Sequence, residues 1–394
     1  MFLFSAARIA NRSHSRVAFV GLVVASISLL LCTSALQAAN YGQEARSSLA
    51  QLQPTGLPTP REANELFRSK LNGSENPIIV ALYDHGRTAV YGYGQMSRLD
   101  PKVPDRDSVF EIGSVSKVFT GLLLAQMVVN NEVNLNDPID KYLPVSVPQW
   151  DKQKITLLHL ATHTSGLPGM PGIKDAATCP IEDIYAALSN CQLRSKPGTT
   201  YLYSNFGAGL LGQALVLRAG ADSFDSLLME RICKPLGMND TRVNYDRAEL
   251  MSRVARCPES SPGKGGTLAG GGAGGIKTTA NDMLKFLAAY IEPEKTSFAP
   301  AIKLSYRLQW KDDNQHTLGL MWNINSMINK GGDVDGYHSK IVFSPERKLG
   351  FFVSRAGTGA LMTNPFVARL LSGEASQGAG IVPADAENQE SADE

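Results

Sequence analysis

The stretch Phe110-Glu111-Ile112-Gly113-Ser114-Val115-Ser116-Lys117 is followed directly by the apolar run Val118-Phe119-Thr120-Gly121-Leu122-Leu123-Leu124. A helix beginning here would place the Ser114 hydroxyl and the Lys117 amine one turn apart. A serine nucleophile needs this spacing if a neutral lysine is to accept its proton. Because the run after Lys117 is apolar nearly all round, it predicts a helix deep in the fold. Burial at a helix start would offer backbone N–H groups to an oxyanion and would lower the pKa of Lys117.

The tetrapeptide alone also fits a plainer interpretation. Serine is a favoured helix cap, so Ser114 could simply cap the helix while Lys117 is solvated. The same S-x-x-K pattern recurs at Ser261-Pro262-Gly263-Lys264, in a Gly-rich segment without helical period, and we interpret that match as accidental. Other motifs of the chain are therefore needed to distinguish a catalytic Ser114–Lys117 pair from a simple helix cap.

Tyr203-Ser204-Asn205 supplies that context, because it is the one Y-x-N in the sequence and precedes the helix-like segment from Phe206 to Leu217. A tyrosine offers a second group for proton transfer, and an asparagine amide can orient both a substrate and Lys117. An isolated Y-x-N is usually a turn tyrosine and a capping asparagine. Together with Ser114 and Lys117, it indicates a catalytic site.

With these motifs the chain resembles the penicillin-recognising serine hydrolases, which include class C β-lactamases, low-molecular-weight DD-peptidases and related serine esterases. The resemblance spans about residues 60 to 370 and rests on motifs that occur in the family's order. These motifs are Phe110 to Lys117, Leu135-Asn136-Asp137-Pro138, Ile155 to Leu167, Pro197-Gly198-Thr199, Tyr203-Ser204-Asn205, Pro235-Leu236-Gly237-Met238 and Gly270 to Thr279. The Pro-Leu-Gly-Met segment, the length and the ending Leu370-Leu371-Ser372-Gly373 are most similar to AmpH-type DD-carboxypeptidase/endopeptidases.

The resemblance implies an α+β fold of the β-lactamase/transpeptidase type, in which helices flank an antiparallel sheet and a mostly helical second lobe completes the site. It implies that Ser114, Lys117, Tyr203 and Asn205 are the catalytic residues. It also places His159 and His163 in a structural segment of the family. No spacing among the Cys and His residues is typical of a zinc site, so we expect neither a metal nor a cofactor.

The family's third motif, Lys-Thr-Gly, corresponds by position to Lys330-Gly331-Gly332, although Lys264-Gly265-Gly266 has the same pattern. The missing hydroxyl at Gly331 leaves Lys330 as a lone charge for a substrate carboxylate. Negative charge on the following aspartates, Asp333 and Asp335, should weaken carboxylate binding further. The resemblance implies that Lys330, Gly331, Gly332 and Asp333 bind substrate, with the N–H groups of Ser114 and Asp333 as oxyanion donors.

Two hairpins are predicted to form the sheet. Pro77 to Leu82 and Thr88 to Tyr93 flank the turn Asp84-His85-Gly86-Arg87, and a second hairpin extends from Tyr337 to Ser354. We expect the helix from Ser114 and a last helix from about Asn364 to pack on this sheet. Residues from about 130 to 265 are predicted to form a mostly helical insertion. We expect the site to lie between this helical lobe and the lobe that contains the sheet.

The N-terminal 39 residues predict export. Arg8, Arg12 and Arg16 precede the apolar run from Val17 to Cys32, and Ala38 or Ala39 offers a cleavage site. This pattern predicts a signal peptide in residues 1–39 and a periplasmic enzyme in 40–373. However, the residue three positions before the cleavage site is not small. An uncleaved membrane anchor is therefore the alternative. Residues 374–394 are acidic and poor in large apolar residues, so we expect a disordered tail.

The charge distribution indicates which partners to expect, and the cysteines indicate which disulfides are possible. The net charge is +1 and Lys and Arg are scattered, which argues against nucleic acid. Beyond the predicted signal peptide the cysteines are Cys179, Cys191, Cys233 and Cys257. They could form up to two disulfides in any of three connectivities, or remain thiols.

Three functions remain open on this sequence. The first is a periplasmic DD-peptidase that acts on peptidoglycan stem peptides through a Ser114 acyl-enzyme. The second is a hydrolase of the same fold that takes a β-lactam or an ester; the lack of a hydroxyl at Gly331 favours an ester. The third is a non-hydrolysing penicillin-binding sensor, against which the presence of Ser114, Lys117, Tyr203 and Asn205 argues. The expected partner is thus a small-molecule or peptide acyl substrate, with membrane contact only through an uncleaved N-terminal segment.

Overall fold

The computed structural model describes residues 57, 61, 63, 75–174, 179–258 and 271–357. The predicted signal peptide, the last helix from about Asn364, the acidic tail and the second Lys-Gly-Gly lie outside these residues. Within the described part of the chain, no helix is long and apolar enough to cross a membrane.

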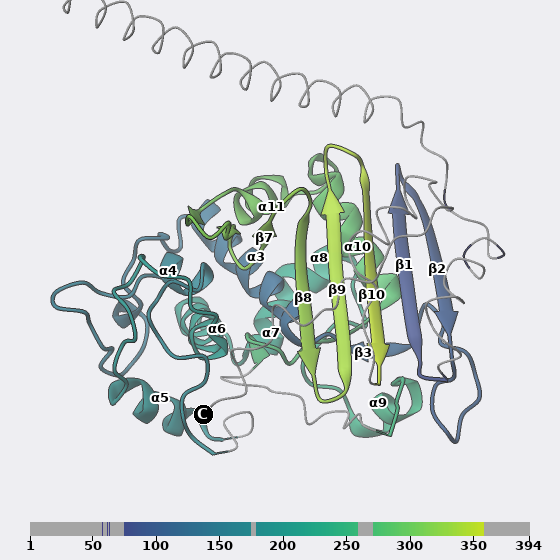
Figure 1. Cartoon of the computed structure of the whole chain (residues 1–394), viewed down its shortest axis with the longest axis horizontal. Coiled ribbons are helices and arrows are strands. Elements are labelled where there is room, and N and C mark those ends of the chain that lie inside the picture. Colours follow the sequence, from purple (N-terminus) through teal and green to yellow (C-terminus); the bar gives the residue numbers. More distant parts are fainter. Residues whose placement is uncertain are drawn as a thin grey trace, which may run out of the picture. The chain divides into compact units, whose positions relative to one another are not determined.

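An eight-stranded antiparallel sheet forms one side of the fold (Figure 1). Its strands follow the order β2-β1-β10-β9-β8-β7-β6-β5. Their bounds are β1 Ile78–Asp84, β2 Arg87–Tyr93, β5 Trp310–Lys311, β6 Thr317–Leu318, β7 Asn323–Ile324, β8 Ile328–Val334, β9 Tyr337–Ser344 and β10 Leu349–Ala356. Both predicted hairpins are confirmed, since β1 pairs with β2 and β9 pairs with β10. His85 and Gly86 join β1 to β2 with positive φ angles, as a two-residue hairpin turn requires.

Apolar clusters lie on both faces of the central strands, which explains why β1 is buried along its whole length. Successive side chains of a strand point to opposite faces. Accordingly, Ile79 and Ala81 join the main core, whereas Ile78 and Val80 join a second cluster that includes Ala63.

The helices that pack in the main core include α3 Ser116–Val129, α10 Ala280–Ile291 and α11 Ala299–Tyr306. The helix α10 contacts β1, β9 and β10, and it begins where the Thr279 side chain accepts a hydrogen bond from the Asp282 N–H. The predicted helix from Ser114 is present, but its first residues form a 3-10 turn, η1 Gly113–Val115, and α3 itself starts at Ser116. As expected from its all-round apolar sequence, α3 is buried over most of its length.

Among the described residues between α3 and the short strand β4 Lys277–Thr279, which pairs with β3 Val109–Glu111, the regular elements are helices. These helices are η2 Ile139–Lys141, α4 Leu157–Ala161, α5 Ile181–Ser189, α6 Asn205–Ala219, α7 Phe224–Leu228, η3 Met229–Cys233, α8 Lys234–Leu236 and α9 Arg247–Arg253. In Figure 1, α4, α5 and α6 lie beside the sheet. The limits of the insertion, about 130 to 265, stay a prediction.

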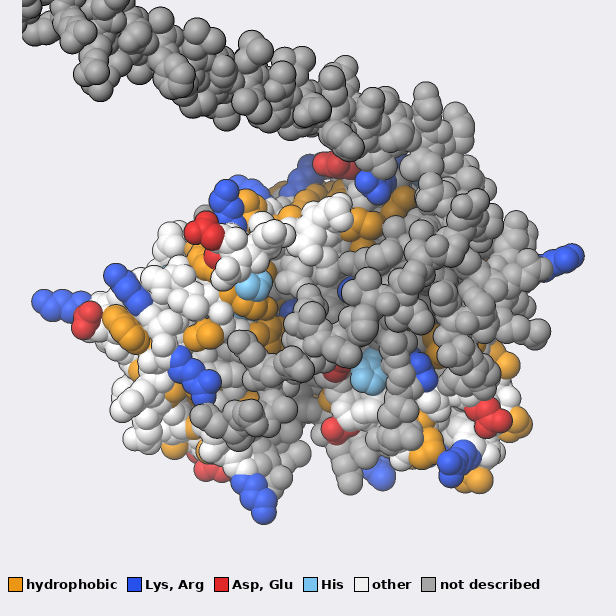
Figure 2. Space-filling model, in the orientation of Figure 1, with side chains coloured by type: hydrophobic (Ala, Val, Ile, Leu, Met, Phe, Trp, Pro, Cys, Tyr) orange, Lys and Arg blue, Asp and Glu red, His pale blue; other side chains and the backbone are white. Residues whose placement is uncertain are grey.

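The sequence predicted scattered surface charge. On the face seen in Figure 2, the described acidic and basic side chains are interspersed.

The four cysteines beyond the predicted signal peptide are thiols in this structure. Cys179 and Cys191 flank α5, whose nine residues span roughly 13 Å. A disulfide needs Cα atoms within about 7 Å, so a bond between these two would require the chain on both sides of α5 to fold back along the helix.

Candidate functional site

The turn that carries Ser114 is pressed against strand β8. Gly113 has a positive φ of 49°, and a Cβ added there would lie 2.8 Å from the backbone of Asp333. On the opposite side, a Cβ at Gly332 would lie 2.2 Å from the carbonyl oxygen of Ile112 and 2.8 Å from the Ser114 nitrogen. Only glycine permits this backbone-to-backbone approach. The first and third motifs therefore meet through two glycines.

Lys117 occupies the first turn of α3, and its side chain is fully buried. Its Nζ lies 2.8 Å from Ser114 Oγ, 2.6 Å from Asn205 Oδ1 and 2.6 Å from the carbonyl oxygen of Ala273. Burial lowers the pKa of Lys117 well below its usual value, and the positive charge of Lys330 lowers it further. A neutral amine has two hydrogens and one lone pair, so donation to the two carbonyl oxygens turns the lone pair toward Ser114.

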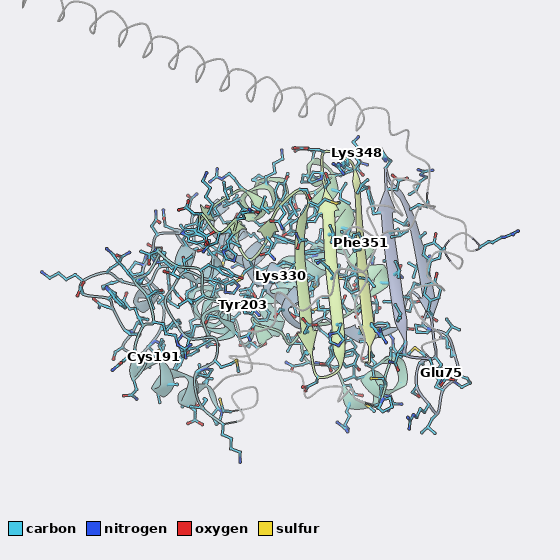
Figure 3. All side chains as sticks on the ribbon, viewed as in Figure 1. Glu75, Cys191, Tyr203, Lys330, Lys348 and Phe351 are labelled. Atoms are coloured by element: carbon cyan, nitrogen blue, oxygen red, sulfur yellow. The ribbon has the colours of Figure 1, made fainter. Side chains whose placement is uncertain are left out.

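Tyr203 reaches Ser114 from the helical side of the site. Its hydroxyl donates a hydrogen bond of 2.7 Å to Ser114 Oγ. The Tyr203 ring lies between two amines, with Lys117 Nζ at 4.9 Å and Lys330 Nζ at 4.7 Å from the ring centroid. Figure 3 shows Tyr203 and Lys330 close together between the helices and β8. Although 36% of Tyr203 is exposed, burial of its inner part raises the pKa of the phenol above its usual value.

Asn205 is the first residue of α6, and the preceding Ser204 caps that helix by accepting the N–H of Gly207 at 2.8 Å. The cap fixes where α6 begins, and it thereby directs the Asn205 amide oxygen to Lys117. The amide nitrogen lies 3.7 Å from Met170 Sδ. The structure thus brings the four residues of the predicted catalytic set, Ser114, Lys117, Tyr203 and Asn205, into one hydrogen-bonded group.

The predicted substrate-binding residues lie on β8, beside this group. Lys330 is buried, with 5% exposure. Gly331 is exposed, and a Cβ added there would meet nothing within 4 Å. The structure therefore has room for the missing hydroxyl. The Asp333 side chain is 66% exposed, and its carboxylate pairs with His338 Nδ1 at 2.5 Å. The use of the Asp333 N–H as an oxyanion donor stays a prediction.

Sequence reasoning missed three contacts of this site. Ala273 contributes only its backbone carbonyl oxygen, which cannot be predicted from the type of side chain. His338 meets Asp333 across the β8–β9 ladder, a pairing that could be read from the sequence only once both strands and their register were known. His163, assigned to a structural segment, packs its ring 4.5 Å from that of Tyr203. In the described residues, no three His, Cys, Asp or Glu side chains gather as a metal-binding group.

Sequence comparison relates the chain to named enzymes. The family described as Beta-lactamase matches residues 71–369. A β-lactamase of Escherichia coli K12 is 30% identical over 305 residues, which cover 66% of this chain and 78% of the relative. The D-alanyl-D-alanine-carboxypeptidase/endopeptidase AmpH of the same strain is 29% identical over 321 residues, which cover 74% of this chain and 82% of AmpH.

Solved structures agree with this relationship. The β-lactamase/D-alanine carboxypeptidase from Yersinia pestis, complexed with citrate, matches with a TM-score of 0.72 at 25% identity and covers 80% of this chain and 97% of its own. The β-lactamase/D-alanine carboxypeptidase from Pseudomonas syringae has a TM-score of 0.68 at 21% identity, which supports the fold alone. The expected α+β fold of the β-lactamase/transpeptidase type is confirmed.

The two neighbouring glycines of β8 provide a test of how closely this strand packs on the nucleophile turn. Gly332→Ala forces a methyl group into the backbone of the turn, and we expect it to lower the free energy of unfolding by about 1–3 kcal/mol. Gly331→Ala enters open space and should leave that free energy nearly unchanged. Urea unfolding of both variants measures the difference, and equal losses would contradict the close approach.

Proposed function

Because the chain belongs to the β-lactamase family and is a serine hydrolase, we propose that it is a periplasmic DD-carboxypeptidase/endopeptidase that cleaves peptidoglycan stem peptides. The observation that carries the catalytic part of this proposal is the position of Ser114 Oγ, which lies 2.8 Å from Lys117 Nζ and 2.7 Å from the Tyr203 hydroxyl. The similarity to AmpH supports the substrate class. The N-terminal pattern up to Ala39 supports the location.

Lys117 is the general base of this proposal. Tyr203 keeps its own proton, since its pKa is raised, and its hydroxyl donates a hydrogen bond to Ser114 Oγ. Ser114 must then direct its hydrogen elsewhere, and the lone pair of a neutral Lys117 faces it. Attack forms the bond from Ser114 Oγ to the substrate carbonyl carbon while the serine proton moves to Lys117 Nζ.

Collapse of the tetrahedral intermediate breaks the carbonyl carbon–nitrogen bond. The departing amine needs one proton, and the Tyr203 hydroxyl, released from Ser114 Oγ when that oxygen becomes an ester, is placed to give it. The proton held by Lys117 then restores the phenol. Water hydrolyses the acyl-enzyme by the reverse sequence, so Ser114 and its partners are regenerated without net consumption of protons.

An ester substrate is the second candidate, and Gly331 favours it. Lys330 offers one buried positive charge to a substrate carboxylate, but Gly331 adds no hydroxyl to it. An ester without a carboxylate needs neither group. A β-lactam carries a carboxylate, as does a D-Ala-D-Ala peptide, so both depend on how well Lys330 alone binds the anion.

Covalent labelling tests the nucleophile. Incubation with penicillin or a fluorophosphonate should add one adduct to the protein at Ser114, because Lys117 and Tyr203 activate this hydroxyl alone. Ser114→Ala should give no adduct, and hydrolysis should fall by several orders of magnitude. Intact-mass analysis followed by peptide mapping measures this. An adduct that survives the substitution, or one that maps to Ser261, would overturn the assignment.

A substrate panel tests the proposed activity. We expect the wild type to cleave a D-Ala-D-Ala peptide, with nitrocefin and a short-chain p-nitrophenyl ester as the competing substrates. Gly331→Thr should improve recognition of the two carboxylate substrates by about 1–3 kcal/mol, the value of a hydrogen bond to a charged group. Ester hydrolysis should change little.

The panel has two unfavourable outcomes for this proposal. Hydrolysis of the ester alone by the wild type would reject the DD-peptidase in favour of an esterase. Efficient peptide cleavage that Gly331→Thr leaves unaltered would mean that the anion is bound elsewhere and that Lys330 is not the third-motif lysine.

A further inference from the structure

His163 contacts the chain on both sides of Tyr203. Its carbonyl oxygen accepts the Leu202 N–H at 2.8 Å, and its Nδ1 accepts the Ser204 N–H at 3.2 Å. Between these two hydrogen bonds, the imidazole ring lies 4.5 Å from the Tyr203 ring, tilted by 37°. One residue therefore holds the backbone before Tyr203, the backbone after it and the ring itself.

The backbone of His163 is held in an unusual conformation at this point. Its φ is +55°, in the left-handed region that residues with a Cβ seldom adopt. Such a conformation is strained and persists where surrounding contacts fix it. His163 follows α4, about 40 residues before the segment it holds, so its position is set by the tertiary fold.

The hydrogen bond from Ser204 defines the protonation state of the ring. Nδ1 accepts a hydrogen bond and so carries no hydrogen, which places the single hydrogen of a neutral ring on Nε2. Nε2 is buried and has no hydrogen-bond partner among the described residues. The charged groups that face the ring are Lys330 and Lys117, and burial together with these two lowers the pKa of His163 well below its usual value. An imidazolium would have a hydrogen on Nδ1 and could not accept the Ser204 N–H.

We propose that His163 is a positioning residue for acylation, whose neutral imidazole fixes Ser204 and the Tyr203 ring so that the Tyr203 hydroxyl remains on Ser114 Oγ. This inference rests on the proposed function, because its test measures the acylation of Ser114. His163 contributes no proton to that reaction and touches no substrate. It acts through Tyr203, because the 2.7 Å bond to Ser114 depends on where the tyrosine is held.

Two substitutions separate the acceptor from the ring. His163→Asn retains an acceptor, since its Oδ1 can replace Nδ1, and asparagine tolerates positive φ. His163→Phe retains a flat ring but leaves the buried Ser204 N–H without an acceptor. The readout is the saturation kinetics of Ser114 phosphonylation by a fluorophosphonate. We expect His163→Phe to lower the maximal rate by about 10- to 100-fold with a similar half-saturating concentration, and His163→Asn to retain most of the rate.

A double-mutant cycle with Tyr203→Phe separates positioning from general structural damage. If His163 acts through the Tyr203 hydroxyl, adding His163→Phe to Tyr203→Phe should cost little further rate. A loss of the same factor in both backgrounds would overturn the proposal, as would His163→Asn with a rate as low as His163→Phe. His163→Asn also keeps the proposal testable if His163→Phe does not fold.

His159→Phe is the matched control, because it removes an imidazole acceptor four residues earlier. His159 Nδ1 accepts the Thr156 N–H in the cap of α4. This variant should lower the melting temperature and leave the phosphonylation rate near that of the wild type; a rate as low as that of His163→Phe would overturn the proposal. A wild type that is not labelled at Ser114 at all would instead reject the proposed function, which distinguishes the two failures.

Discussion

The burial of the Lys117 amine is the constraint on which the site depends. Three segments that are distant in sequence meet at this atom: the Ser114 turn, the start of α6 through Asn205, and the loop before β4 through Ala273. A fully buried ammonium is unfavourable, whereas a neutral amine with two carbonyl acceptors is satisfied and keeps its lone pair for the serine. The environment that packs the first turn of α3 therefore also makes Lys117 a base.

The remaining parts of the site support this arrangement from either side. On the sheet side, β8 approaches the Ser114 turn so closely that Gly113 and Gly332 have no room for a side chain. Lys330 projects from the same strand, and its positive charge further disfavours protonation of Lys117. On the helical side, the segment that carries Tyr203 is held by hydrogen bonds to His163. The helices thus supply both partners of the serine, Lys117 and Tyr203, while the sheet supports the Ser114 turn and carries Lys330.

The sequence predicted those features that local patterns encode. Two strand-like segments flanking the turn Asp84-His85-Gly86-Arg87 identified the first hairpin, and the S-x-x-K spacing identified the pair Ser114 and Lys117. The strands β5 to β7 escaped prediction because they are two residues each, and β8 contains two glycines that are unfavourable in strands. Ala273 and His163 were missed because a backbone carbonyl has no sequence signature and the contacts of a buried histidine follow from tertiary packing.

The central claim, that Lys117 is neutral in the folded enzyme, is tested by the pH dependence of stability. Between the lowered pKa of Lys117 and the ordinary value of 10.5, the unfolded chain binds a proton that the folded chain does not. The free energy of unfolding should therefore rise with pH more steeply in the wild type than in Lys117→Met, by about 1.4 kcal/mol per pH unit. Urea unfolding at several pH values in this range measures both slopes. Parallel slopes would show that folded Lys117 is protonated and would contradict its role as the base.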